Sequence, residues 1–144
     1  MKKLTLFLSS FLFLLSSCAP QPAAPQPLTV MTHDSFSVSE EVVAAFETAN
    51  NAKVTFLQSG DAGAVLNKAI LTKDAPLADV LFGVDNTFLS RALEADIFEP
   101  YASPALADIP AAFQLDASNR ALPVDYGDVC INYDKAYFAD NALA

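Results

Sequence analysis

The alternation of apolar and polar positions divides this chain into segments typical of strands and helices. A short apolar run from Leu28 to Met31 leads directly into the polar residues His33, Asp34 and Ser35. Such a run suits a strand buried on both faces, as in a parallel sheet covered by helices. The polar residues would then stand at the carboxyl end of the strand, which is the edge where open α/β sheets bind ligands.

Two further strand and helix pairs follow the first. β-branched and aromatic residues predict the strands, and apolar residues at helical spacing predict the helices. The first helix is expected to begin at a capping box formed by Ser37 and Glu40. The predicted segments, strands and helices in turn, are residues 28–31, 37–50, 53–58, 61–73, 79–82 and 88–93. Three such pairs in succession predict an α/β lobe with a mostly parallel sheet.

The pattern weakens in the last third of the chain. Residues 97–119 are rich in Pro and Asp, with short helical turns expected around Ala105 and Ala111. An extended segment over 122–133, broken at Gly127, comes next. We therefore expect a first lobe over 28–124, and a hinge with the beginning of a truncated second lobe over 125–144.

The N-terminus has the pattern of an export signal. Lys2 and Lys3 precede an apolar run over 4–15, which is too short to span a bilayer. Two serines then stand directly before Cys18, which resembles a bacterial lipobox and predicts a signal peptide over 1–17 with lipid on that cysteine. The alternative is an ordinary signal peptide in which the cysteine is incidental. Four prolines within 18–27 predict an extended tether, so the folded part would be extracytoplasmic and lipid-anchored.

Composition narrows the possible partners. The chain has 144 residues, of which 53% are apolar, and a formal net charge of −9. This allows one sizeable core, and it makes nucleic acid and anionic membrane surfaces poor partners, whereas cations would be attracted. Contact with the membrane is thus expected through the lipid anchor alone.

Polar clusters that contain aspartate follow the predicted strands and the first extended run. One interpretation of each cluster is purely structural: its aspartate caps a helix, a position at which aspartate is favoured. The functional interpretation is a crevice for a cation that carries hydrogen-bond donors and a flat ring, since carboxylates and aromatic faces both attract cations. The candidate ligand-binding residues are His33, Asp34, Ser35, Asp61, Asp85, Asp125 and Tyr126.

Enzyme and metal sites are not predicted. His33, Asp34 and Ser35 are consecutive at a strand end and should point in different directions, which disfavours a charge-relay arrangement. No His or Cys spacing typical of a metal site occurs. Cys130 lies between Val129 and Ile131, and we expect it to be a small buried hydrophobic residue. No catalytic residue and no cofactor are therefore assigned.

Several segments in order resemble the thiamine-binding proteins of bacterial ABC importers. The segments that carry the resemblance are 28–36, 66–68, 78–86, 124–127 and 133–135. The resemblance implies a two-lobed type II periplasmic-binding fold of about twice this length, acting as a monomer that delivers thiamine or a thiamine phosphate to a permease. It also implies that Asp61 faces the aminopyrimidine or phosphate region, that Asp125 and Tyr126 sit at the hinge, and that His33 lines the cleft.

Receptors for polyamines or ferric iron share this fold and remain alternatives. A thiamine-cleaving enzyme of the same fold is a less favoured alternative. Counting back from Tyr133, the nucleophilic cysteine of such enzymes would stand at Gly127, and Cys130 comes three residues later. We therefore expect a binding protein without catalysis.

Overall fold

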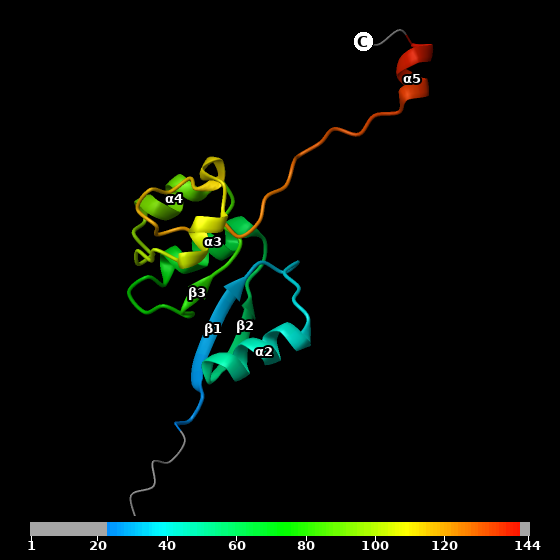
Figure 1. The fold of residues 1–144 in the computed structure, drawn as a ribbon. Helices are drawn as coiled ribbons and strands as arrows, with labels where there is room; N and C mark the ends of the chain where they lie inside the picture. Colours follow the sequence, from blue (N-terminus) through cyan, green and yellow to red (C-terminus); the bar gives the residue numbers. More distant parts are fainter. Residues whose placement is uncertain (1–22, 142–144) are drawn as a thin grey trace, which may run out of the picture.

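The computed structural model describes residues 23–141, so the predicted signal peptide, Cys18 and the first half of the predicted tether lie outside the described residues. A parallel sheet with helices around it confirms the predicted α/β class (Figure 1). The elements are β1 (Gln26–Thr32), α2 (Glu40–Asn50), β2 (Ala52–Gln58), α3 (Ala62–Leu71), β3 (Val80–Leu81), α4 (Leu89–Glu94), two 3-10 turns, η2 (Pro104–Asp108) and η3 (Ala111–Phe113), and α5 (Lys135–Asp140).

Strand β1 lies at the centre of the sheet, in the order β2-β1-β3. It pairs with β2 along its whole length, whereas only Val30 and Met31 pair with β3. The short β3 is extended by Asp79, whose backbone N–H donates to Thr29 O at 2.9 Å and whose Oδ2 accepts from Thr29 N at 2.8 Å. All three strands run in the same direction, so their carboxyl ends meet at one edge.

Strand β1 begins at Gln26, two residues before the predicted start. Gln26 N donates to Asn51 O at 2.8 Å, which joins this end of β1 to the start of β2. Successive N–H groups in a strand point to opposite sides, so the nitrogen of Pro27 faces the β3 side, where pairing starts only at Val30. Pro27 thus loses no ladder bond, and the sheet accommodates it.

Helix α2 corrects the predicted capping box. The helix begins at Glu40 and its cap is Ser39, whose Oγ accepts from Val42 N at 3.5 Å, whereas Ser37 lies outside the helix. The helix runs beside the edge strand β2. There Glu47 Oε1 accepts from Val54 N at 2.7 Å, which satisfies an edge N–H that no neighbouring strand reaches. This backbone bond is the main cause of the lowered pKa of Glu47.

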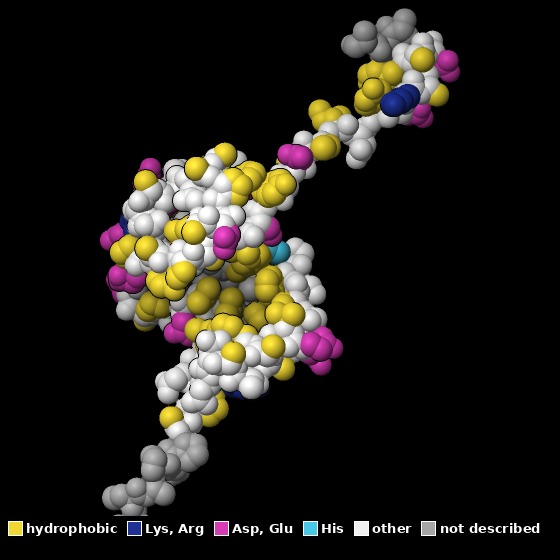
Figure 2. Space-filling model, in the orientation of Figure 1, with side chains coloured by type: hydrophobic (Ala, Val, Ile, Leu, Met, Phe, Trp, Pro, Cys, Tyr) yellow, Lys and Arg dark blue, Asp and Glu magenta, His cyan; other side chains and the backbone are white. Residues whose placement is uncertain are grey.

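The hydrophobic core is small and lies between β1, α3 and α4. Its buried apolar side chains are Met31, Val65, Leu66 and Ala92. The expectation that the first strand is buried on both faces is wrong for Leu28, Thr29 and Val30, which are only half-buried, because α2 contributes no buried residue to cover them. Figure 2 shows hydrophobic side chains still visible in a hollow on the side drawn.

The last third of the chain is mostly irregular, as predicted. The expected turns near Ala105 and Ala111 are η2 and η3. Beyond them the chain extends away from the sheet, and α5 lies apart from the other helices (Figure 1). Cys130 is exposed, which corrects its predicted burial, because the segment around it packs against no other element. No helix within residues 23–141 is long and apolar enough to cross a membrane.

Candidate ligand-binding site

The loops that follow the three strands meet at the carboxyl edge of the sheet, the edge where the sequence placed the polar residues after the first strand. The loop after β1 contacts the loop after β2 through Asp34, whose N–H donates to Gly60 O at 2.9 Å. It contacts the loop after β3 through His33, whose ring lies against Gly83. Residues distant in sequence are thereby brought together at the edge where ligands bind in sheets of this kind.

His33 is half-buried, and its orientation is set by its neighbours. Its Nδ1 lies 2.9 Å from Ser35 Oγ, within hydrogen-bond distance. Its ring centroid is 5.7 Å from that of Phe82 and 6.5 Å from that of Phe36. Among the described residues, Nε2 has no hydrogen-bond partner, so this nitrogen remains available to a solute.

Asp34 does not complete a catalytic triad with the Ser35–His33 pair. Its Oδ1 accepts from Gly60 N at 2.8 Å, so this carboxylate turns toward the loop after β2. The hydrogen bond between Ser35 and His33 was not foreseen from the sequence. A serine and a histidine without the third group lack the orienting partner that nucleophilic catalysis of this kind uses.

Asp61 and Asp85 each satisfy backbone N–H groups with one carboxylate oxygen. Asp61 Oδ1 caps α3 by accepting from Ala64 N at 2.7 Å, which confirms the capping interpretation at this position. Asp85 Oδ1 accepts from Thr87 N at 2.9 Å and from Phe88 N at 3.1 Å, in the turn before α4. No hydrogen bond to a described residue engages Oδ2 of either carboxylate, so each keeps an acceptor for a ligand donor.

Asp125 and Tyr126 are not joined to this edge. Both are exposed, and the ring of Tyr126 stacks on Phe113 of η3 with centroids 4.6 Å apart and an interplanar angle of 16°. No hydrogen bond within residues 23–141 links Asp125 to the loops after the strands. The structure therefore places five of the seven predicted residues in the loops at the carboxyl edge of the sheet and leaves Asp125 and Tyr126 outside them.

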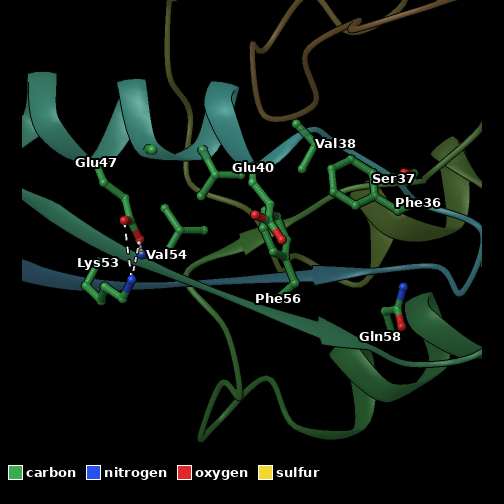
Figure 3. A pocket seen from close by; sticks show the side chains of 11 residues that line it. Phe36, Ser37, Val38, Glu40, Glu47, Lys53, Val54, Phe56 and Gln58 are labelled. Atoms are coloured by element: carbon green, nitrogen blue, oxygen red, sulfur yellow. Dashed lines mark hydrogen bonds and ion pairs between the residues drawn. The ribbon is translucent and has the colours of Figure 1, made fainter.

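A hollow among the described residues lies elsewhere, between α2 and β2. It has a volume of about 470 Å³, and Figure 3 shows the side chains around it. Apolar groups such as Phe36, Val54 and Phe56 line it, and the Glu47–Lys53 ion pair, at 3.2 Å, closes one end. None of the seven predicted residues lines this hollow, although the carboxylate of Glu40 and the amide of Gln58 are among its polar lining groups.

Two features of the edge were missed from the sequence. Gly83 has a φ of +109°, and a Cβ atom there would lie 2.5 Å from His33 Cδ2, so the close approach of the ring requires glycine. A glycine directly after the predicted strand 79–82 was the available indication. Lys68 Nζ donates to Ser59 Oγ at 3.0 Å, which ties α3 to the end of β2. A lysine on a helix carries no comparable indication, because most lysines are solvated.

Metal binding has no support in the described part of the chain. Within residues 23–141, no three His, Cys, Asp or Glu side chains gather as potential metal ligands. The carboxylates of Asp34, Asp61 and Asp85 lie on three different loops, and each is bonded to backbone N–H groups. Such carboxylates suit an organic cation with several donors better than a compact ion.

Known proteins of similar sequence indicate the family of the chain. Residues 41–144 match the family described as bacterial extracellular solute-binding protein. The chain is 30% identical over 143 residues to the thiamine-binding periplasmic protein of Brucella abortus, covering 95% of this chain and 39% of that protein. It is 32% identical over 139 residues to the protein of the same name from Haemophilus influenzae, covering 92% and 40%. For the Escherichia coli protein of that name the identity is 31% over 127 residues, covering 85% and 38%.

The chain spans about two fifths of the length of these relatives. The match to the family model nevertheless covers most of the chain, from α2 to its last residue. A parallel α/β lobe whose strand ends gather polar side chains fits part of a periplasmic-binding fold. On this evidence the chain belongs to the bacterial extracellular solute-binding proteins.

Proposed function

We propose that the protein containing this chain is an extracytoplasmic receptor that delivers thiamine, or a thiamine phosphate, to an ABC importer. The observation that supports the proposal is that His33, Asp61 and Asp85 lie in the three loops at one edge of the sheet, each with a polar atom that bonds no described residue. The names of the relatives, thiamine-binding periplasmic proteins at 30–32% identity, support the choice of solute.

The chemistry of thiamine fits this edge. Thiamine carries one fixed positive charge on its thiazolium ring, and its aminopyrimidine both donates and accepts hydrogen bonds. The Oδ2 atoms of Asp61 and Asp85 are acceptors for the amino group and attract the cation, and Nε2 of His33 can donate or accept. Asp125 and Tyr126 belong to the proposal as hinge residues that approach the solute only when a second lobe closes on it.

The remaining parts of the proposal concern the setting of the receptor. Lipid on Cys18 would anchor it, and the proline-rich segment before β1, up to Pro25, would separate the lobe from the membrane. We propose that it acts as a monomer, that the permease is its protein partner, and that it binds solute without catalysis. The acidic charge of −9 supports a cationic solute and disfavours nucleic acid.

A polyamine receptor is the second candidate, because carboxylates spread along an edge also suit a chain of several charges. Competition decides between the two. Isothermal titration of the protein expressed from the whole reading frame should detect thiamine binding, and spermidine at comparable concentration should not displace it. Displacement by spermidine would assign the receptor to polyamines, and tight ferric iron binding would assign it to iron.

Asp61→Asn tests the site itself. Asparagine retains the capping acceptor for α3 but removes the charge, so thiamine affinity should fall by about 1.5–3 kcal/mol, the range for a hydrogen bond to a charged group. Asp74→Asn is the matched control, because Asp74 is exposed in the loop before β3, at the opposite edge of the sheet. Equal affinities of the two variants would show that Asp61 serves only as a helix cap.

A further inference from the structure

Asp34 and Gly60 are joined by a reciprocal pair of hydrogen bonds. Asp34 N donates to Gly60 O at 2.9 Å, and Gly60 N donates to Asp34 Oδ1 at 2.8 Å. A third bond, from Gln58 Nε2 to Asp34 O at 3.3 Å, joins the end of β2 to the loop after β1. The loop after β1 therefore holds the loop after β2 through both backbone and side chain.

The held segment, residues 59–61, has a conformation that needs support. Gly60 has a φ of +92°, and a Cβ atom there would lie 3.0 Å from Ala64 Cβ. From the other side, Lys68 Nζ donates to Ser59 Oγ, and Ser59 is only 8% exposed. The segment ends at Asp61, whose Oδ1 caps the N-terminus of α3. The position of the Asp61 carboxylate thus depends on contacts at both sides of Gly60.

We propose that Asp34 is a positioning residue, which holds Gly60 so that Asp61 faces the solute, and that it is not itself the charge partner of the solute. This inference rests on the proposed function for its ligand. An ionised carboxylate forms a stronger hydrogen bond to a backbone N–H than a neutral acceptor does, and the bond fixes a glycine that is otherwise conformationally free.

The two roles predict different results for one pair of variants. Asparagine at position 34 keeps an acceptor for Gly60 N but loses the charge, whereas alanine loses both. If Asp34 acts through Gly60, Asp34→Ala weakens thiamine binding about tenfold or more, and Asp34→Asn restores affinity to within about threefold of the wild type. If Asp34 contacts the cation directly, both variants weaken binding alike, which would overturn the proposal.

A second measurement needs no ligand. Amide hydrogen exchange at Gly60, followed by NMR on the whole protein, should accelerate about tenfold in Asp34→Ala and much less in Asp34→Asn. Asp85→Ala is the matched control, because it releases Thr87 N and Phe88 N and should leave Gly60 exchange unchanged. Unchanged Gly60 exchange in Asp34→Ala would overturn the inference.

The two measurements separate this inference from the proposed function. If the wild-type protein binds no thiamine, the proposed solute is wrong, and Gly60 exchange still decides whether Asp34 holds this segment. A second outcome is that thiamine binds, that Asp61→Asn lowers the affinity, and that Asp34→Asn and Asp34→Ala lower it equally. The receptor assignment then stands and the positioning role of Asp34 fails. Thermal unfolding of each variant identifies any global loss of stability, which would accelerate exchange throughout the lobe.

Discussion

The imidazole of His33 lies on the backbone of Gly83, so closely that a Cβ atom at position 83 would stand 2.5 Å from His33 Cδ2. This contact joins the loop after β1 to the loop after β3 without any hydrogen bond between them. It also explains why position 83 is a glycine. Only glycine allows both the positive φ and the close approach of the ring.

Gly83→Ala should therefore destabilise the lobe, by about 1–3 kcal/mol, because the backbone is strained and the histidine ring must move. Urea denaturation gives the free energy of unfolding. The double variant Gly83→Ala/His33→Ala should recover part of the lost unfolding free energy, since the smaller side chain at position 33 removes the clash. Strictly additive losses would show that the backbone conformation alone is responsible.

Because the core is small, alanine substitutions at two leucines of α3 should differ greatly in their effect on the free energy of unfolding. Leu66 is fully buried, whereas Leu71 on the same helix is 85% exposed. Leu66→Ala should cost about 2–5 kcal/mol of unfolding free energy, through lost burial and a residual cavity. Leu71→Ala should change it by less than about 0.5 kcal/mol. Comparable losses would mean that α3 does not pack on β1 as described.

The hydrogen bonds of Asp116 predict that the fold around this residue loses stability in acid. Its carboxylate accepts hydrogen bonds from the side chain and N–H of Ser118 and from the N–H groups of Ala121 and Arg120, and these hold its pKa at about 2, below the usual 3.8. Because the pKa of Asp116 is lower in the folded state than in the unfolded state, its ionised carboxylate stabilises the fold at pH values above the unfolded-state pKa. This contribution is lost as the pH falls from about 4 toward 2.

The measurement is amide exchange at Arg120 and Ala121 as the pH falls through this window. Protection at these two residues should decrease in the wild type, and in Asp116→Asn it should be low already at neutral pH. Asp108→Asn serves as the control, because Asp108 is exposed and its side chain accepts no hydrogen bond from a described residue. Protection that stays constant in the wild type down to pH 2 would contradict the assignment.

Lipid attachment gives a prediction outside the described residues. Metabolic labelling with a fatty-acid analogue should mark the wild-type protein and Cys130→Ser, and it should not mark Cys18→Ser. The two cysteines of the chain thus provide their own control. Equal labelling of all three proteins would exclude Cys18 as the acceptor, and the export segment would then be an ordinary signal peptide.

The order of strands and helices could be read from the sequence because it rests on local periodicity. The spacing of Val65 and Leu66 predicts the buried side of α3, and Asp61 predicts its cap. The boundaries were less certain. Ser37 and Ser39 are both plausible caps for α2, and the choice of Ser39 depends on where the backbone turns after Phe36. The expected burial of Cys130 failed because its β-forming neighbours have no partner strand in the described structure.

The sequence by itself thus determined an α/β lobe with polar residues at its strand ends, since side-chain alternation and capping are properties of neighbouring residues. Only the tertiary structure decided which of those residues meet. The order β2-β1-β3 places the loop after β1 between the other two, so Asp34 reaches Gly60 on one side and His33 reaches Gly83 on the other. Such contacts depend on strand pairing over long sequence separations, which no local pattern encodes.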